Sequence, residues 1–277
     1  MIKVSVLGGK EFPTKEKMFK WLKENKEAII LERKSESKTK TLTGILGFVD
    51  VKNNTVKGIP NMDDDYIYPI ISNTNYMDSH KDVHITGSMT KTAKDQNHKV
   101  YYLADHQLKM DGIIATPKNV EVILQELKWS ELGRNYEGMT EALIFKVKKD
   151  EIINDKFKQL IDKGEDLQNS IRMQYLKLTV GFNSEEKEYK EEKAVWDEVY
   201  PSIVNKEVAD EDGYFFAVKE LKLHLEGSAV LFGSNDATPI KITQTEKSPE
   251  DIEAEKSLQA KEEAKILNEK FYNNIKI

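Results

Sequence analysis

The segment YFFAVKELKLHLEGSAVLF (residues 214–232) is the longest β-forming stretch of the chain and decides which fold to expect. It begins with aromatic residues and valine, and three leucines between residues 221 and 225 then alternate with polar residues, as in a strand with one buried face. Glu226 is out of phase with these leucines and on the same side as His224. We therefore predict a long strand that carries a carboxylate and an imidazole on its polar face.

Other strand patterns are spread along the chain and are separated by helical patterns. Strands are predicted at residues 1–8, 41–51, 83–87, 98–105, 112–117, 139–150 and 175–182. Helices are predicted at residues 14–30, at 88–96, at 119–129 (alternatively a strand with one turn), on both sides of Gly164 within 150–174, and at 248–277. Because strands and helices do not alternate strictly, we predict an α+β fold, with a mostly antiparallel β-barrel or sheet core surrounded by helices.

The composition limits the class of protein. The chain has 277 residues, a net charge of −6, 32% charged residues and no cysteine, which excludes disulfides, thiolate catalysis and Cys-ligated zinc. The acidic balance argues against nucleic-acid binding. The N-terminal residues lack the apolar core of a signal peptide, and no stretch is long enough to cross a bilayer. We therefore expect a soluble intracellular protein that binds neither nucleic acid nor membrane.

Three polar residues occupy strand positions from which they could reach a common site. His106 follows the run VYYLAD (residues 100–105), Thr179 precedes Gly181 in YLKLTVGF, and Glu226 lies on the long strand. A base, a hydroxyl and a carboxylate are the components of a hydrolase nucleophile site, and a backbone amide near Gly181 could stabilise an oxyanion. Taken singly, each has a more ordinary interpretation, as a surface histidine, a β-branched strand residue or a solvent-facing charge. His224 is a second candidate imidazole on the face of Glu226.

No metal site is predicted. His80 and His84 have the spacing i, i+4, but the segment DSHKDVHITG (residues 78–87) does not have a helical pattern, so this spacing does not bring the two rings together. The acidic run at residues 63–65 lacks a second cluster of ligands and is interpreted as a solvated loop.

Taken in order, these segments resemble the prohead (head maturation) proteases of tailed bacteriophages, which share their fold with herpesvirus assemblins. DVHITGSMTKTAKDQNHKVYYLADHQ (residues 82–107) resembles the family segment that ends on a strand followed by Asn/Asp-His. LTVGF (residues 178–182) resembles the family's "lSiGf" strand, and LHLEGSAVLFGSNDA (residues 223–237) resembles its "l.EvS.V..paN..A" segment. The resemblance covers about residues 42–240.

The resemblance implies an organisation and a function. It implies an N-terminal strand-helix segment (1–41), a protease-like domain (42–240) with a charged insert (183–213), and a C-terminal helical tail (241–277). It also implies an endopeptidase without a cofactor that cleaves scaffold and major capsid protein inside the assembling procapsid in the host cytoplasm, and then cleaves itself. A homo-oligomer inside the procapsid is compatible with this role. We expect residues 183–199, which have no obvious apolar stripe, to form an exposed helix or a mobile excursion. The whole insert (183–213) is expected to project from the sheet, where it could gate substrate or bind a capsid partner.

The resemblance assigns His106 as general base, residue 179 as nucleophile and Glu226 as acidic partner, but the family nucleophile is serine and residue 179 is threonine. Three interpretations follow. Thr179 is a slower nucleophile, because its methyl group restricts the rotamer and crowds the approach to a carbonyl. Alternatively, Ser170, nine residues earlier, is the nucleophile. In the third interpretation the chain is a catalytically degenerate relative that acts as a structural factor in head assembly.

Overall fold

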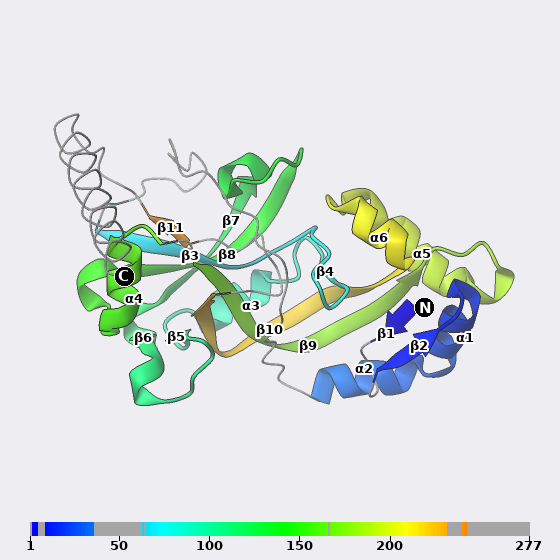
Figure 1. Cartoon of the computed structure of the whole chain (residues 1–277), viewed down its shortest axis with the longest axis horizontal. Helices are drawn as coiled ribbons and strands as arrows, with labels where there is room; N and C mark the ends of the chain where they lie inside the picture. Colours follow the sequence, from blue (N-terminus) through cyan, green and yellow to red (C-terminus); the bar gives the residue numbers. More distant parts are fainter. Residues whose placement is uncertain are drawn as a thin grey trace, which may run out of the picture. The chain divides into compact units, whose positions relative to one another are not determined.

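The structure is a computed structural model of the chain in which residues 2–4, 9–35, 63, 65–165, 167–231 and 240–242 are described (Figure 1). The predicted strand at 41–51 and the predicted helix at 248–277 lie outside the described residues. The fold is α+β, and Met1–Ile242 form one compact unit. The helices of the described part are α1 (Lys15–Glu24), α2 (Lys26–Ser35), α3 (Thr90–Gln96), α4 (Asp155–Asp162), α5 (Lys190–Val199) and α6 (Lys206–Asp212).

Two long antiparallel strands, β9 (Gln168–Phe182) and β10 (Tyr214–Val230), form the longest pair of the first sheet, with β10 at its centre, and run side by side through this unit (Figure 1). The other edge of β10 pairs in parallel with β4 (Asp82–His84) near its start and with β5 (Tyr101–Ala104) near its end. β6 (Ile113–Ala115) then adds to β5 in antiparallel orientation. The segments with the candidate site residues therefore belong to one mixed sheet.

A second, antiparallel sheet has the strand order β11-β3-β8-β7, and β1 pairs with β2 in a separate hairpin. The bounds of these strands are β1 Ile2–Val4, β2 Lys10–Phe12, β3 Tyr66–Asn73, β7 Glu121–Lys128, β8 Met139–Lys148 and β11 Ile240–Ile242. Within the described residues the sheets do not close into a barrel, so the sheet form of the prediction holds and the barrel form does not.

The two large sheets pack closely at Gly227 of β10. A Cβ atom at this position would lie 2.8 Å from Ile71 Cγ2 of β3 and 2.8 Å from Phe145 Cε2 of β8. The Phe145 ring also packs edge-on against Tyr102, whose hydroxyl donates to Asn169 Oδ1 at 2.8 Å. Since Gly227 lies between Glu226 and Ser228, the packing of the core fixes the strand on which the candidate carboxylate lies.

Two predicted helices are strands. Among the described residues of 150–174 the one α-helix is α4, and β9 begins at Gln168 and pairs with β10 along its length. The sequence IRMQYLKL has apolar residues that fit both a helical and an alternating pattern, and pairing with β10 selects the strand. Residues 121–128 likewise form β7, followed by the 3-10 turn Trp129–Leu132, as in the alternative interpretation of 119–129.

The N-terminal segment packs into the core of the same unit. Thr14 caps α1, where its Oγ1 accepts from Lys17 N at 3.4 Å. The predicted single helix is divided into α1 and α2 at Asn25, whose side-chain amide donates to the Trp21 carbonyl. The Phe19 ring stacks on Phe182 of β9 with 5.0 Å between ring centroids.

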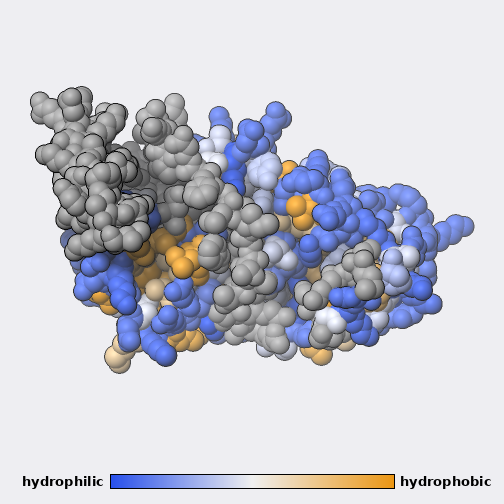
Figure 2. All heavy atoms as spheres, in the orientation of Figure 1, coloured by the Kyte–Doolittle hydropathy of each residue, from blue (hydrophilic) through white to orange (hydrophobic). Residues whose placement is uncertain are grey.

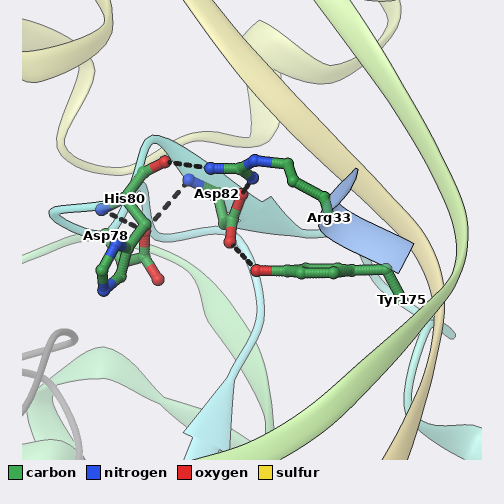
Figure 3. A network of polar contacts seen from close by, with 5 residues as sticks. All are labelled: Arg33, Asp78, His80, Asp82 and Tyr175. Carbon is green, nitrogen blue, oxygen red and sulfur yellow. Dashed lines mark hydrogen bonds and ion pairs between the residues drawn. The ribbon is translucent and has the colours of Figure 1, made fainter. Parts of the chain in front are cut away.

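A buried polar network joins α2 to the first sheet (Figure 3). The Arg33 guanidinium forms an ion pair with Asp82 of β4 and donates to the His80 carbonyl at 2.9 Å. The Tyr175 hydroxyl of β9 donates to the other oxygen of Asp82, and Asp78 Oδ1 accepts from the backbone amides of His80 and Asp82. The charge of Arg33 is thus satisfied inside the protein, as a buried charge requires.

The charged insert contains the helix predicted within residues 183–199, as α5, but it is packed against the first sheet and is neither exposed as a whole nor an excursion. Its residues include α5 and α6, and the Trp196 ring stacks on both Tyr200 and Phe215 with centroid distances of 4.9 and 5.0 Å. Val199 and Ala209 are also buried in this cluster. The prediction failed because the apolar residues that pack are few and dispersed among many charges. Separately, none of the described helices is long and apolar enough to span a membrane.

Candidate active site

The structure brings His106 and Glu226 together in a buried pair. His106 Nδ1 lies 2.8 Å from Glu226 Oε1, and the exposed fractions of the two side chains are 4% and 0%. The pairing of β5 with β10 explains the contact, because His106 follows the end of β5 and Glu226 lies on the β10 segment that pairs with β5. Two residues 120 positions apart in the sequence are therefore held by strand register.

The backbone on both sides of this pair adopts an unusual conformation. Asp105 and His106 have positive φ angles of 50° and 56°, and Leu225, which precedes Glu226, has a φ of 65°. Three hydrogen bonds hold the turn after β5: Asp105 N to Ala229 O, His106 N to Ser228 Oγ, and Gln107 N to Ala104 O. Non-glycine residues in this region store strain of about 1–3 kcal/mol each and cluster at functional sites.

The Glu226 carboxylate accepts hydrogen bonds from three side chains. Oε1 accepts from His106 and, at 3.0 Å, from Arg172 Nε, while Oε2 accepts from Ser228 Oγ at 2.6 Å. Burial, the largest single influence, acts to raise the pKa of Glu226, but the hydrogen bond and charge of His106 and the hydrogen bonds of Ser228 and Arg172 together outweigh it. The pKa of Glu226 is therefore lowered, and the carboxylate is ionised at neutral pH.

The opposite nitrogen of the His106 ring is available for chemistry. Nε2 is buried and has no hydrogen-bond partner among the described residues. With Nδ1–H directed at the ionised Glu226, Nε2 carries the lone pair of the neutral ring. This is the arrangement of a general base whose tautomer and orientation are fixed by a carboxylate.

A serine on the neighbouring strand completes the group. Ser170 of β9 is the register partner of Ser228 of β10, and Arg172, two positions further along β9, is on the same face of the sheet as Ser170. Directly paired residues of antiparallel strands have Cα atoms about 4.5–5.5 Å apart. Ser170 is therefore next to the residues that bind Glu226 and the backbone of His106, and it is 5% exposed.

Ser228 is a less suitable nucleophile than Ser170. Its hydroxyl donates to Glu226 Oε2 and accepts from the backbone amide of His106, and the residue has no exposed surface. Ser228 thus links the turn of His106 to the carboxylate and serves to position both.

Thr179 and Gly181 do not lie with His106 and Glu226, contrary to the predicted cluster. Thr179 is paired with Ala217 and is nine positions from Ser170 on β9, which corresponds to on the order of 30 Å along the strand at about 3.3 Å per residue. Gly181 is paired with Phe215, and a Cβ atom there would lie 3.0 Å from Trp196 N, so this glycine allows α5 to approach β9. The amide of Gly181 is equally remote from the pair.

The phase of the long strand also differs from the prediction. Leu221 and Leu223 are buried as expected, but Leu225 is 47% exposed and Glu226 is fully buried. A β-bulge between Leu223 and Gly227 shifts the register, so alternation is not maintained across it. The imidazole bonded to Glu226 is that of His106, and His224 lies within the bulged stretch.

Sequence reasoning missed Arg172 as a site residue, and it noted Ser228 only as part of a motif. Arg172 carries a weak signal, since it follows Ser170 at the spacing of one strand face, but that signal appears only once the segment is recognised as a strand. In the described part of the chain no group of three or more His, Asp or Glu side chains is arranged to hold a metal ion.

Exposed apolar side chains surround the turn after His106. Leu108 and Met110 are 56% and 88% exposed, and Ile153, whose amide donates to the Ile114 carbonyl of β6, is 58% exposed. Figure 2 shows a mainly hydrophilic face with hydrophobic side chains gathered on the side where β6 and α4 lie.

Comparison of the chain with protein-family models, with curated proteins and with solved structures gave no match.

Proposed function

We propose that the protein is a serine-type endopeptidase that processes scaffold and major capsid protein during the assembly of a phage head, and that Ser170 is its nucleophile. The observation that carries the proposal is the buried His106–Glu226 pair, with a free Nε2 and a serine on the adjoining strand. The resemblance of residues 82–107 and 223–237 to prohead proteases supports the choice of substrate.

The proposed mechanism assigns one role to each of these groups. His106 Nε2 accepts the proton of the Ser170 hydroxyl as its oxygen attacks the peptide carbonyl. Glu226 holds the ring through Nδ1 and stabilises the imidazolium that forms. The imidazolium then protonates the leaving amine as the C–N bond breaks, and a water molecule, deprotonated by the same ring, releases the acyl group from Ser170.

The alternative function, a degenerate relative that serves only in assembly, rested on threonine at the nucleophile position and on the charged helix predicted at 248–277, which lies outside the described residues. Thr179 lies on a part of β9 that is remote from His106. Whether residue 179 is serine or threonine is therefore not informative about this site. Thr179 is instead a half-buried strand residue, in line with the β propensity of threonine.

The first test compares Ser170→Ala and Thr179→Ala, which each remove one hydroxyl from β9. Each purified full-length variant is incubated alone and with scaffold or capsid protein, and truncation is followed by mass spectrometry. We expect Ser170→Ala and His106→Ala to lower the cleavage rate by at least a factor of about 10³, and Thr179→Ala to leave it within a factor of two. A fluorophosphonate probe should label the peptide that contains Ser170. Loss of cleavage in Thr179→Ala alone, or an inactive wild-type protein, would contradict the proposal.

A further inference from the structure

Arg172 shares one carboxylate oxygen with the proposed catalytic histidine. Glu226 Oε1 accepts from His106 Nδ1 at 2.8 Å and from Arg172 Nε at 3.0 Å, so the two donors converge on a single atom. The Arg172 side chain is only 13% exposed and Glu226 is fully buried, so solvent screens this group weakly. Arg172 is not required to bind a proton or to attack a substrate, and the proposed mechanism assigns it no role.

The charges of Arg172, Glu226 and His106 together indicate a role for Arg172. An arginine side chain stays protonated throughout the pH range in which proteins work. If His106 faced only the buried carboxylate, its protonated form would be strongly favoured, and the ring would be a poor base near neutral pH. With Arg172 on the same oxygen, protonation of His106 places a second cation beside one anion, and this repulsion disfavours the imidazolium.

We propose that Arg172 is a positioning residue that fixes the Glu226 carboxylate and lowers the proton affinity of His106, and so sets the lower pH limit of the site. The effect on the pH range of cleavage rests on the proposed function, whereas the effect on the ionisation of His106 does not. Arg172 and Ser170 lie on one face of β9, so the strand that supplies the hydroxyl also adjusts the base.

The substitutions of Arg172 leave all other charged groups near His106 unchanged. Strand β6, which pairs with β5, carries no charged side chain. The turn after β5 carries exposed charges only. The charged side chains on the elements around the ring are Glu226, Lys222, Glu220 and Lys219 of β10, Arg172 and Lys177 of β9, and Asp105, Lys109 and Asp111 of the turn. The titratable His224 lies within the irregular stretch of β10 between Leu223 and Gly227.

The decisive measurement is an NMR titration of the His106 ring in the full chain. Ser170→Ala serves as background so that the chain stays intact, and His106→Gln assigns the resonance. We expect Arg172→Met to raise the pKa of His106 by about one pH unit, as expected when a cation within a few ångströms is removed. Arg172→Lys, which keeps the charge, should restore most of the difference. Lys177→Met is the matched control, because it removes an equal charge from an exposed β9 side chain paired with Glu220.

Each outcome of the titration either supports or overturns the proposed role of Arg172. An unchanged or lowered pKa in Arg172→Met overturns the proposal, as does an equal shift in Lys177→Met. If Arg172→Met does not fold, Arg172→Gln, which also removes the charge, replaces it and must raise the pKa of His106 in the same direction.

The same variants, made with Ser170 intact, connect the ionisation to catalysis. The acid limb of the pH–rate profile should move upward in Arg172→Met by the shift seen in the titration, with little change of rate on the alkaline side. A uniform loss of rate without a shifted limb would show a purely structural role for Arg172. Cleavage that survives Ser170→Ala would refute the proposed function and leave the titration result standing.

Discussion

Hydrogen bonds from three strands converge on Glu226. His106 follows β5, Arg172 lies on β9 and Ser228 lies on β10, and together they use both carboxylate oxygens. A buried carboxylate is tolerated only when such donors compensate for its lost hydration. The same three bonds therefore stabilise the fold and orient the proposed base, so both properties depend on the ionisation of Glu226.

Removing the Glu226 charge should weaken the pH dependence of stability. A carboxylate whose pKa is lower in the folded than in the unfolded state stabilises the fold fully above its unfolded pKa, and this contribution is lost as the pH falls through the folded pKa. We expect Glu226→Gln to lower the free energy of unfolding at pH 7 by about 1.5–3 kcal/mol, the contribution of a hydrogen bond to a charged group. Urea unfolding at pH 7 and below pH 4.5 should show the difference between variant and wild type shrinking with acid. Glu126→Gln, on an exposed position of β7, is the control; a difference that stays constant with pH would contradict the linkage.

At the scale of single residues, the sequence was informative about His106 and Glu226 and misleading about the hydroxyl. Thr179 and Ser170 both lie in segments with apolar residues at every second position, and the glycine after Thr179 matched a family pattern. The pairing register of β9 with β10 decides which hydroxyl is near the carboxylate, and register depends on long-range pairing. A single segment read by itself does not contain that information.

At the scale of elements, the bulge in β10 determines how the site is built. It lets Leu225 face outward, Glu226 point into the buried group and Gly227 meet the second sheet, which strict alternation would not allow. The strand itself could be predicted from residues 214–232, but the bulge could not, because Leu225, with its positive φ, lies where the pairing register of β10 with β9 shifts, and register depends on long-range pairing. The helix predicted after Gly164 failed for a related reason, since β10 provides the hydrogen-bond partners that make the segment a strand.

Close packing at Gly227 predicts that Gly227→Ala is destabilising. The added methyl group would lie 2.8 Å from atoms of Ile71 and Phe145, both of which are fully buried, so the sheets must separate locally. Overpacking of this kind costs about 1–3 kcal/mol, to be measured by chemical denaturation. In a Phe145→Leu background, which removes one of the two clashes, the same substitution should cost less. Strict additivity of the two substitutions would show that the clash is absent.

At the scale of the whole unit, segments that seemed peripheral in the sequence are part of the core. The N-terminal helices pack on β9 through Phe19 and Phe182, and the charged insert packs through Trp196 and Phe215. Residues 9–35 therefore belong to the same packed unit as β9, although a segment boundary was predicted at residue 41. The high charge content of the insert predicted an exposed segment. Charge content describes the solvent-facing side of a helix and does not identify the few apolar side chains that pack against the sheet.

The Arg33 network provides the last prediction. Arg33 is 2% exposed and forms an ion pair with the fully buried Asp82. The distance from Arg33 Cζ to the centroid of the Phe216 ring is 3.9 Å. Burial acts most strongly, to lower the pKa of Arg33, but the charge of Asp82 and the hydrogen bond to it keep the pKa above its ordinary value. Arg33→Met leaves the buried Asp82 without its cation, and breaking a buried pair from one side costs about 3–5 kcal/mol.

The double variant Arg33→Met/Asp82→Asn separates the loss of the ion pair from the loss of packing. Replacing both charges removes the uncompensated carboxylate, so the double variant should be more stable than Arg33→Met alone when both are measured by urea denaturation at pH 7. Tyr175 still has an acceptor in the asparagine carbonyl, which keeps the rest of the network satisfied. If the double variant is instead the less stable of the two, the network contributes mainly through shape, and α2 is held to the sheet by packing around Arg33 and not by its charge.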